Sequence, residues 1–163
     1  MTTPNENRDG AERIWRLMNR YRICMLATQD GTTIRARPMA VHLAPAENAV
    51  YFLTDEGRHK DDEIVANPNV CLAFSDDDGD DYVSVSGHAA VTNDRAKIKE
   101  LWSLAAKTWW DSADDPNIRL LKVTPTDAEY WDGENKIIAS MKMAAAAMTG
   151  ERPDLGENKK VRM

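Results

Sequence analysis

Several cationic and hydroxyl side chains lie close together in one stretch of the sequence. Arg35 and Arg37 alternate on one predicted strand, Thr54 ends the next, and a helical pattern begins near Lys60. Guanidinium groups, hydroxyls and the free N–H groups of a helix start are the donors that bind phosphate. The stretch therefore predicts a site for a small phosphorylated ligand.

The same cations also have a plainer interpretation. Arg58 and Lys60 can be solvated charges at a helix end, since charged residues are common on protein surfaces. Either Arg35 or Arg37 can be a charge at the rim of a sheet. Residue types alone leave both interpretations open.

Other kinds of site have little support in the sequence. His42, His59 and His88 have no metal-ligand spacing with a cysteine or with each other, so we predict no metal site. No glycine-rich phosphate loop and no Gly-x-Ser-x-Gly motif occurs. Counted from Asp76, the acidic run 76–81 places Asp81 where a calcium loop needs Gly and Gly87 where it needs Glu, which favours a charged turn. No side chain is assigned as a catalytic acid or base.

Composition indicates a globular protein with one domain over 1–163. The chain has 163 residues, of which 42% are hydrophobic and 29% charged, and a net charge of −6. An acidic chain repels nucleic acid, and no apolar run is long enough for a membrane span. The N-terminus resembles no secretory signal, and Cys24 and Cys71 are expected to be buried free thiols. We therefore expect a cytoplasmic protein.

The hydrophobic pattern predicts many short strands and a few helices. Strands are expected at 23–28, 33–43, 49–54, 70–75, 82–92, 118–123 and 128–131. Helices are expected at 9–21, 60–67, 94–110 and 141–148. Asp30-Gly31 is typical of a hairpin turn, and Pro125 separates the last two strands. This order favours a closed or nearly closed antiparallel barrel over 22–132, followed by a C-terminal helix and tail over 137–163.

A series of short motifs extends over nearly the whole chain. In order, they are Arg37-Pro38-Met39, Val50-Tyr51-Phe52-Leu53-Thr54 with Lys60, Asn67-Pro68-Asn69-Val70, Tyr82-Val83-Ser84-Val85-Ser86-Gly87, Glu100-Leu101-Trp102, Trp109, Asp115-Pro116, Glu129-Tyr130-Trp131-Asp132, Thr149-Gly150 and Leu155-Gly156-Glu157-Asn158. In this order and spacing they resemble the FMN-binding split barrel of the pyridoxamine 5′-phosphate oxidase type. The closest resemblance is to the bacterial general stress protein branch. It implies a mainly β fold with flanking helices, an antiparallel split β-barrel.

The resemblance also implies a set of cofactor contacts. The residues that would contact the phosphate of FMN are Arg37, Thr54 and Lys60, assisted by Arg58 or His59. Backbone groups of Pro38 and Met39 would lie near the polar edge of the flavin ring. FAD remains an open alternative to FMN.

Members of this family are homodimers with two flavins at the interface. A tryptophan from the partner would then cover the ring, and Trp109, Trp110 and Trp131 are the candidates. For each of them, ordinary packing in a core or interface is an equally good interpretation.

The chain departs from the oxidase pattern at three places. His42 replaces a second phosphate-side lysine, and Arg58-His59-Lys60 replaces Ser-Arg-Lys. The C-terminal Arg-x-His segment that holds the pyridoxal substrate has no counterpart, since Asp154 follows Arg152 by two positions. The resemblance thus supports the cofactor and argues against a true pyridoxamine phosphate oxidase.

Two classes of function follow. One is a flavin-dependent oxidoreductase that acts on an unidentified small molecule, with the flavin supplying the chemistry. The other is a non-catalytic protein that stores or senses flavin. A third possibility keeps the barrel and replaces FMN with FAD, the deazaflavin F420 or haem.

Overall fold

The computed structural model describes residues 4–57, 59–75, 81–133, 136–150 and 156–163. Its α-helices are α1 (Pro4–Met18), α2 (His59–Ala66), α3 (Arg95–Leu101) and α4 (Lys136–Thr149). Its strands are β1 (Ile23–Asp30), β2 (Thr33–Ala40), β3 (His42–Ala44), β4 (Ala49–Asp55), β5 (Asn69–Ser75), β6 (Tyr82–Thr92), β7 (Ile118–Gly133) and β8 (Gly156–Arg162). Two short 3₁₀ helices are η1 (Pro45–Glu47) and η2 (Ala106–Thr108).

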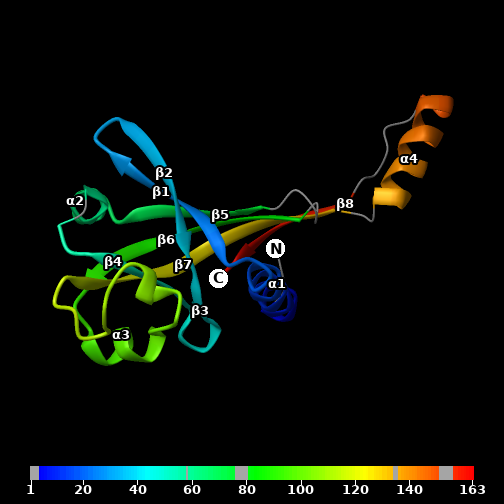
Figure 1. Ribbon diagram of the computed structural model, residues 1–163. Coiled ribbons are helices and arrows are strands. Elements are labelled where there is room, and N and C mark those ends of the chain that lie inside the picture. The colour runs from blue at the N-terminus through cyan, green and yellow to red at the C-terminus, as the bar shows by residue number, and fades with distance from the viewer. Residues whose placement is uncertain (1–3, 58, 76–80, 134–135, 151–155) are drawn as a thin grey trace.

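The strands form one antiparallel sheet in the order β2-β1-β5-β6-β7-β4-β3, and β8 adds to β7 (Figure 1). The strands at the two ends of this order, β2 and β3, are consecutive in the chain and are separated only by Val41. The Val41 N–H donates to the Arg22 carbonyl oxygen at 3.0 Å, which holds this junction beside the start of β1. The sheet must therefore curl toward closure, and the predicted antiparallel split barrel is confirmed.

The core lies inside the curled sheet. Every second residue of β1, β5 and β6 is buried, as expected for strands with one face on a core. Helix α1 contributes Ile14 and Met18 to this core. A second, smaller cluster joins Ile98 of α3 to Tyr51 of β4 and Leu120 of β7.

Most predicted elements are present, with different bounds. Helix α1 begins at Pro4, where a proline is tolerated because the first helical N–H groups have no partner. The expected strand 33–43 is interrupted at Val41. The C-terminal helix begins earlier than expected and ends before Gly150, whose φ is +72°.

The expected helix 94–110 is wrong in its second half. Asp94 caps α3 by accepting a hydrogen bond from the Lys97 N–H at 3.0 Å, but α3 ends at Leu101. Trp102 has an extended backbone, with φ −62° and ψ 128°. The helical apolar spacing misled because Leu101 and Trp102 pack onto the smaller cluster from the end of a helix and an extended segment.

Two expectations for the C-terminal half are also wrong. Pro125 does not end a strand, because β7 continues through it opposite Gly87, where the pairing with β6 shifts. This approach is so close that a Cβ on Gly87 would lie 2.6 Å from the Thr124 carbonyl oxygen, so the position requires glycine. The polar tail, for which no strand was expected, supplies β8.

Both cysteines are free; Cys24 is buried and Cys71 is only half-buried. Among the described residues, no helix is long and apolar enough to cross a membrane. In the same part of the chain, no three His, Cys, Asp or Glu side chains gather where they would hold a metal ion.

Candidate functional site

Arg37 joins three elements at one end of the barrel. Its Nη2 donates to the Thr28 hydroxyl of β1 at 2.9 Å and to the Glu63 carboxylate of α2 at 2.7 Å. Thr28 also donates to the same carboxylate. These bonds hold α2 against the β1–β2 hairpin, and Figure 1 shows the helix beside that hairpin.

Glu63 is a buried carboxylate that stays charged. Only 4% of its side chain is exposed, compared with 23% for Arg37. Burial alone raises the pKa of Glu63, but the hydrogen bonds from Thr28 and Arg37 outweigh it, so the pKa lies below its usual 4.5. The pair is therefore ionised at neutral pH, and Glu63 neutralises part of the charge that Arg37 brings.

Thr54 lies near the end of β4, five positions before α2 begins. It stands opposite Arg119 of β7 in the sheet and is buried. Asp61, in the first turn of α2, is influenced by the charges of Lys60 and Arg119. Burial is the main reason why the pKa of Asp61 is raised. Helix α2 is thus bonded to Arg37 through Glu63, and its first turn lies within the electrostatic influence of Arg119, the partner of Thr54 in the sheet.

Three side-chain atoms in this region are buried without a hydrogen-bond partner. They are Arg37 Nη1, Thr54 Oγ1 and Asp61 Oδ1, and in the described part of the chain no other buried side-chain nitrogen or oxygen lacks one. Buried polar groups are nearly always paired, so these three exceptions on β2, β4 and α2 need an explanation. Arg37 and Thr54 offer donors, which suit an anion. The carboxylate of Asp61 only accepts hydrogen bonds and so does not suit an anion; burial raises its pKa.

The structure describes the remaining predicted ligands unequally. Lys60 lies half-buried in the first turn of α2, three residues before Glu63. His59 opens this helix, whereas Arg58 lies outside the described residues. In β2, Met39 packs against the main core and Pro38 is exposed on the opposite side of the strand.

His42 stands opposite Tyr51 in the β3–β4 pair. Burial lowers the pKa of His42, which keeps the imidazole neutral at pH 7. The position at which the oxidase pattern has a lysine therefore adds no positive charge here.

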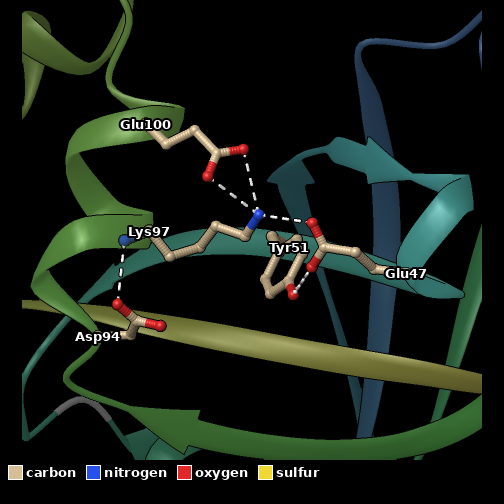
Figure 2. A network of polar contacts seen from close by, with 5 residues as sticks. All are labelled: Glu47, Tyr51, Asp94, Lys97 and Glu100. Carbon is tan, nitrogen blue, oxygen red and sulfur yellow. Dashed lines mark hydrogen bonds and ion pairs between the residues drawn. The ribbon is translucent and has the colours of Figure 1, made fainter.

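The segment that carries Trp109 and Trp110 is held against the barrel by α3. Lys97 Nζ donates to Glu47 at 2.6 Å and to both oxygens of Glu100 at 3.1 Å (Figure 2). The Tyr51 hydroxyl donates to the other Glu47 oxygen, and Lys97 Nζ lies 5.1 Å from the centre of the Tyr51 ring.

This network also shifts the ionisation of its members. Hydrogen bonds from Lys97 and Tyr51 hold the pKa of Glu47 below its usual value, and the two carboxylates raise the pKa of Lys97. Because all of its members are paired at neutral pH, the network fixes α3 on β4. Arg95 extends the anchorage to the next loop by donating to the carbonyl oxygens of Ala113, at 2.8 Å, and Asp115, at 2.9 Å.

The candidate tryptophans occupy different places. The Trp110 indole N–H donates to Asp55, the residue after Thr54. Its neighbour Trp109 is 77% exposed. Trp131 lies on β7 twelve positions after Arg119, which is about 40 Å along an extended strand. Within one chain, Trp131 therefore cannot contact a ligand bound at Thr54.

Several residues of the cluster were not foreseen. Glu63 follows Lys60 by three helical positions, so helical spacing contained a signal for it. Thr28 and Arg119 gave no such signal. The strand register places Thr28 opposite Arg35, within diagonal reach of the Arg37 side chain, and Arg119 opposite Thr54.

A family model described as pyridoxamine 5′-phosphate oxidase like matches residues 9–154. The chain belongs to this family. The match spans every residue of the site, from Thr28 to Trp131, and confirms the resemblance expected from the motifs.

Relatives of this pyridoxamine 5′-phosphate oxidase-like protein include general stress proteins. General stress protein 26 of Bacillus subtilis is 33% identical over 97 residues, which cover 58% of this chain and 69% of the relative. A structure assigned as general stress protein 26 from Jannaschia sp. CCS1 has a TM-score of 0.77 at 29% identity and covers 96% of this chain and 99% of its own. The general stress FMN/FAD binding protein of Xanthomonas citri has a TM-score of 0.69 at 24% identity, with 79% and 92% covered. This last likeness shows the fold alone.

The ion pair in the cluster generates a prediction about stability. Replacing Arg37 with Met leaves the buried Glu63 carboxylate without its cation, so we expect a loss of about 3 kcal/mol in the free energy of unfolding at pH 7. The matched change is Arg35→Met on the same strand, because Arg35 is 54% exposed and pairs at the surface with Asp30. The free energy of unfolding of Arg35→Met at pH 7 should fall by less than about 1 kcal/mol. Urea unfolding of the flavin-free chain measures both.

The same comparison has a pH dependence. A carboxyl whose folded pKa is lowered contributes stability above its unfolded pKa and loses it as the pH falls through the folded value. In Arg37→Met, burial without a cation raises the pKa of Glu63. Protonation of Glu63 then removes the unpaired buried charge and restores part of the variant's free energy of unfolding. The difference from wild type should shrink between pH 7 and about pH 4. Equal losses in the two variants, or a constant difference, would contradict this account of Glu63.

Proposed function

We propose that this protein binds FMN and holds its phosphate at the cluster of Arg37, Thr54 and Lys60. The observation that carries the proposal is that two donors of this set, on β2 and β4, are buried without a hydrogen-bond partner. Arg37 Nη1 and Thr54 Oγ1 are donors, and phosphate oxygens are the acceptors that a helix start and a guanidinium favour. Lys60, in the same turn, supplies a further cation.

Family membership supports the flavin part of this proposal, and the Xanthomonas citri protein of the same fold is named for binding FMN or FAD. Arg58 and His59 precede and open α2, where they would assist at the phosphate. Backbone groups of Pro38 and Met39, on edge strand β2, would lie along the flavin ring. We prefer FMN to FAD because the cations of the cluster are few and partly neutralised by Glu63.

The catalytic proposal is a flavin-dependent oxidoreductase that acts on a small molecule in the cytoplasm. Bound FMN supplies hydride or electron transfer, and the protein positions it and excludes water. The cluster residues serve the phosphate, so none of them is proposed as an acid or base. A non-catalytic protein that stores or senses flavin is the second candidate, and the sequence Arg152-Pro153-Asp154 in place of the oxidase's substrate segment favours it.

We further propose that the functional unit is a homodimer with flavin at its interface. Trp109 and Trp131 are partly or largely exposed, and the length of β7 separates Trp131 from the phosphate cluster of its own chain. A partner subunit brings such a side chain to the flavin without any change in the fold. Exposed aromatic residues are also enriched at the cores of interfaces.

The phosphate assignment predicts a selective loss of affinity. Lys60→Ala should weaken FMN about 10- to 100-fold, because a charge-assisted hydrogen bond to phosphate is removed. Riboflavin has no phosphate, so its affinity should change less than about threefold. Lys99→Ala on α3 removes an exposed lysine and should leave both affinities unchanged. Titration calorimetry measures the four variant–ligand pairs, and equal loss of FMN and riboflavin in Lys60→Ala would sink the assignment.

Turnover separates the two candidate functions. If the protein is an oxidoreductase, the FMN-loaded protein should oxidise NADH or NADPH over many cycles in the presence of an electron acceptor, faster than free FMN at the same concentration. Loss of reduced nicotinamide absorbance is the measurement, with free FMN as the control. Stable binding of FMN with no rate above this control would favour storage or sensing.

A further inference from the structure

Helix α4 stands apart from the barrel. Figure 1 shows it at the far end of the ribbon formed by β7 and β8, away from the β1–β2 hairpin. The ends of that ribbon are fixed, because Gly133 of β7 pairs with Gly156 of β8. In the part of the chain that is described, no helix or strand packs extensively against α4.

The surface of α4 is nevertheless apolar. Met141 is 68% exposed and Met148 is 89% exposed, and they lie seven positions apart on one side of the helix. Ala144 and Ala145, also exposed, lie between them and complete a stripe. A helix of 14 residues that no other described element packs against extensively is marginal in water, and an apolar helix is normally buried. The stripe therefore requires a surface that covers it.

A second uncovered apolar surface lies on β1 and β2. Strand pairing places Ile23 beside Ala40, and the exposed residues of the two strands alternate with buried ones in β1. The apolar residues exposed on this outer face are Ile23, Met25, Ile34, Ala36, Pro38 and Ala40. It is continuous across the sheet with β5, since Met25 pairs with Ala73.

We propose that α4 of each subunit packs through its Met141–Met148 stripe on the outer face of β1–β2 in a second copy of the chain. The Gly133–Gly156 tether holds α4 away from this face in its own chain. In two copies related by a twofold axis, each α4 stripe covers the outer face of β1–β2 in the other chain. This exchange of arms buries both apolar surfaces of both chains. A different protein would cover the arm and leave the outer face exposed.

The dimensions of the two surfaces agree. At 1.5 Å per residue, α4 is about 21 Å long. Ile34 and Ala40 are six positions apart on β2, or about 20 Å. Half the surface of a helix of this length and about 10 Å diameter is about 330 Å². Two exchanged arms and the faces beneath them then bury about 1,300 Å² in total, within the range of stable interfaces.

The inference rests on the homodimer of the proposed function but not on its flavin. Trp131 pairs with Asn158 in the ribbon that carries α4. The same exchange that docks α4 would therefore carry Trp131 toward the partner.

Charge placed in the stripe tests the proposal on the full-length, flavin-free chain. Met141→Glu with Met148→Glu should raise the dimer dissociation constant at least 100-fold, because each carboxylate would be buried in an apolar contact. The matched control is Met143→Glu with Ala147→Glu, which adds the same charge to the opposite side of α4 and should raise it less than tenfold. Subunit exchange between fluorescently labelled chains gives the constants. Circular dichroism should show both variants folded, because α4 is apart from the core.

Each possible result of this experiment either supports the arm exchange or overturns it. A wild-type chain that is a monomer overturns both the arm exchange and the proposed homodimer. A wild-type dimer that Met141→Glu with Met148→Glu leaves intact, or that both variants weaken equally, overturns the exchange alone and leaves the flavin proposal standing.

A photo-crosslinker at Met148 provides the second measurement, with chains of natural and ¹⁵N composition mixed before irradiation. We expect peptides that join α4 of one chain to β1 or β2 of the other. Links only within one chain, or to another surface of the partner, would overturn the proposal.

Discussion

The joining of β2 to β3 through Val41 is the constraint on which the rest of the structure depends. These strands are the two ends of the sheet order, so a single residue between them forces the sheet to curl. Curling brings the β1–β2 hairpin and the end of β4 to the same end of the barrel. Helix α2 is the next element after β4 in the chain, and it lies between the β1–β2 hairpin and the end of β4. The fold thereby brings near one another the elements that carry Arg37, Lys60 and Thr54, the residues proposed to hold the phosphate.

Closure also explains why charge is buried at this place. The Arg37–Glu63 ion pair stabilises the packing of α2 against the barrel. The Glu63 carboxylate also neutralises part of the positive charge that would otherwise attract an anion. Two hydrogen-bond donors remain available to a ligand, one guanidinium nitrogen and one hydroxyl. Both are buried and without partners, and their direction is fixed. Donors that are fixed before a ligand arrives lose little entropy on binding, which favours a small, well-defined group such as a phosphate.

Sequence reasoning succeeded where local patterns decide and failed where register decides. The strand 82–92 was predicted with the bounds of β6, because alternation and flanking turns are local signals. The continuation of β7 through Pro125 was missed, since it depends on Gly87 across the sheet. The helix 94–110 was too long, because Trp102 meets the smaller core from an extended backbone.

The candidate site divides in the same way. Residue type and family motif predict Arg37, Thr54 and Lys60 as phosphate ligands, and this assignment stays a prediction. Their partners Thr28 and Glu63, and the position of Arg119 opposite Thr54, follow from tertiary contacts that spacing alone does not reveal. The distance of Trp131 from the cluster likewise required knowing that β7 is a single strand.

The most direct test of the central claim is native mass spectrometry of the purified protein after incubation with an equimolar mixture of FMN, FAD, riboflavin and haem. We predict a complex that retains one FMN per chain, with FAD and riboflavin retained to a much smaller extent. Preferential retention of riboflavin or haem, or binding of none of the four, would contradict the assignment of a phosphate-bearing flavin to this site.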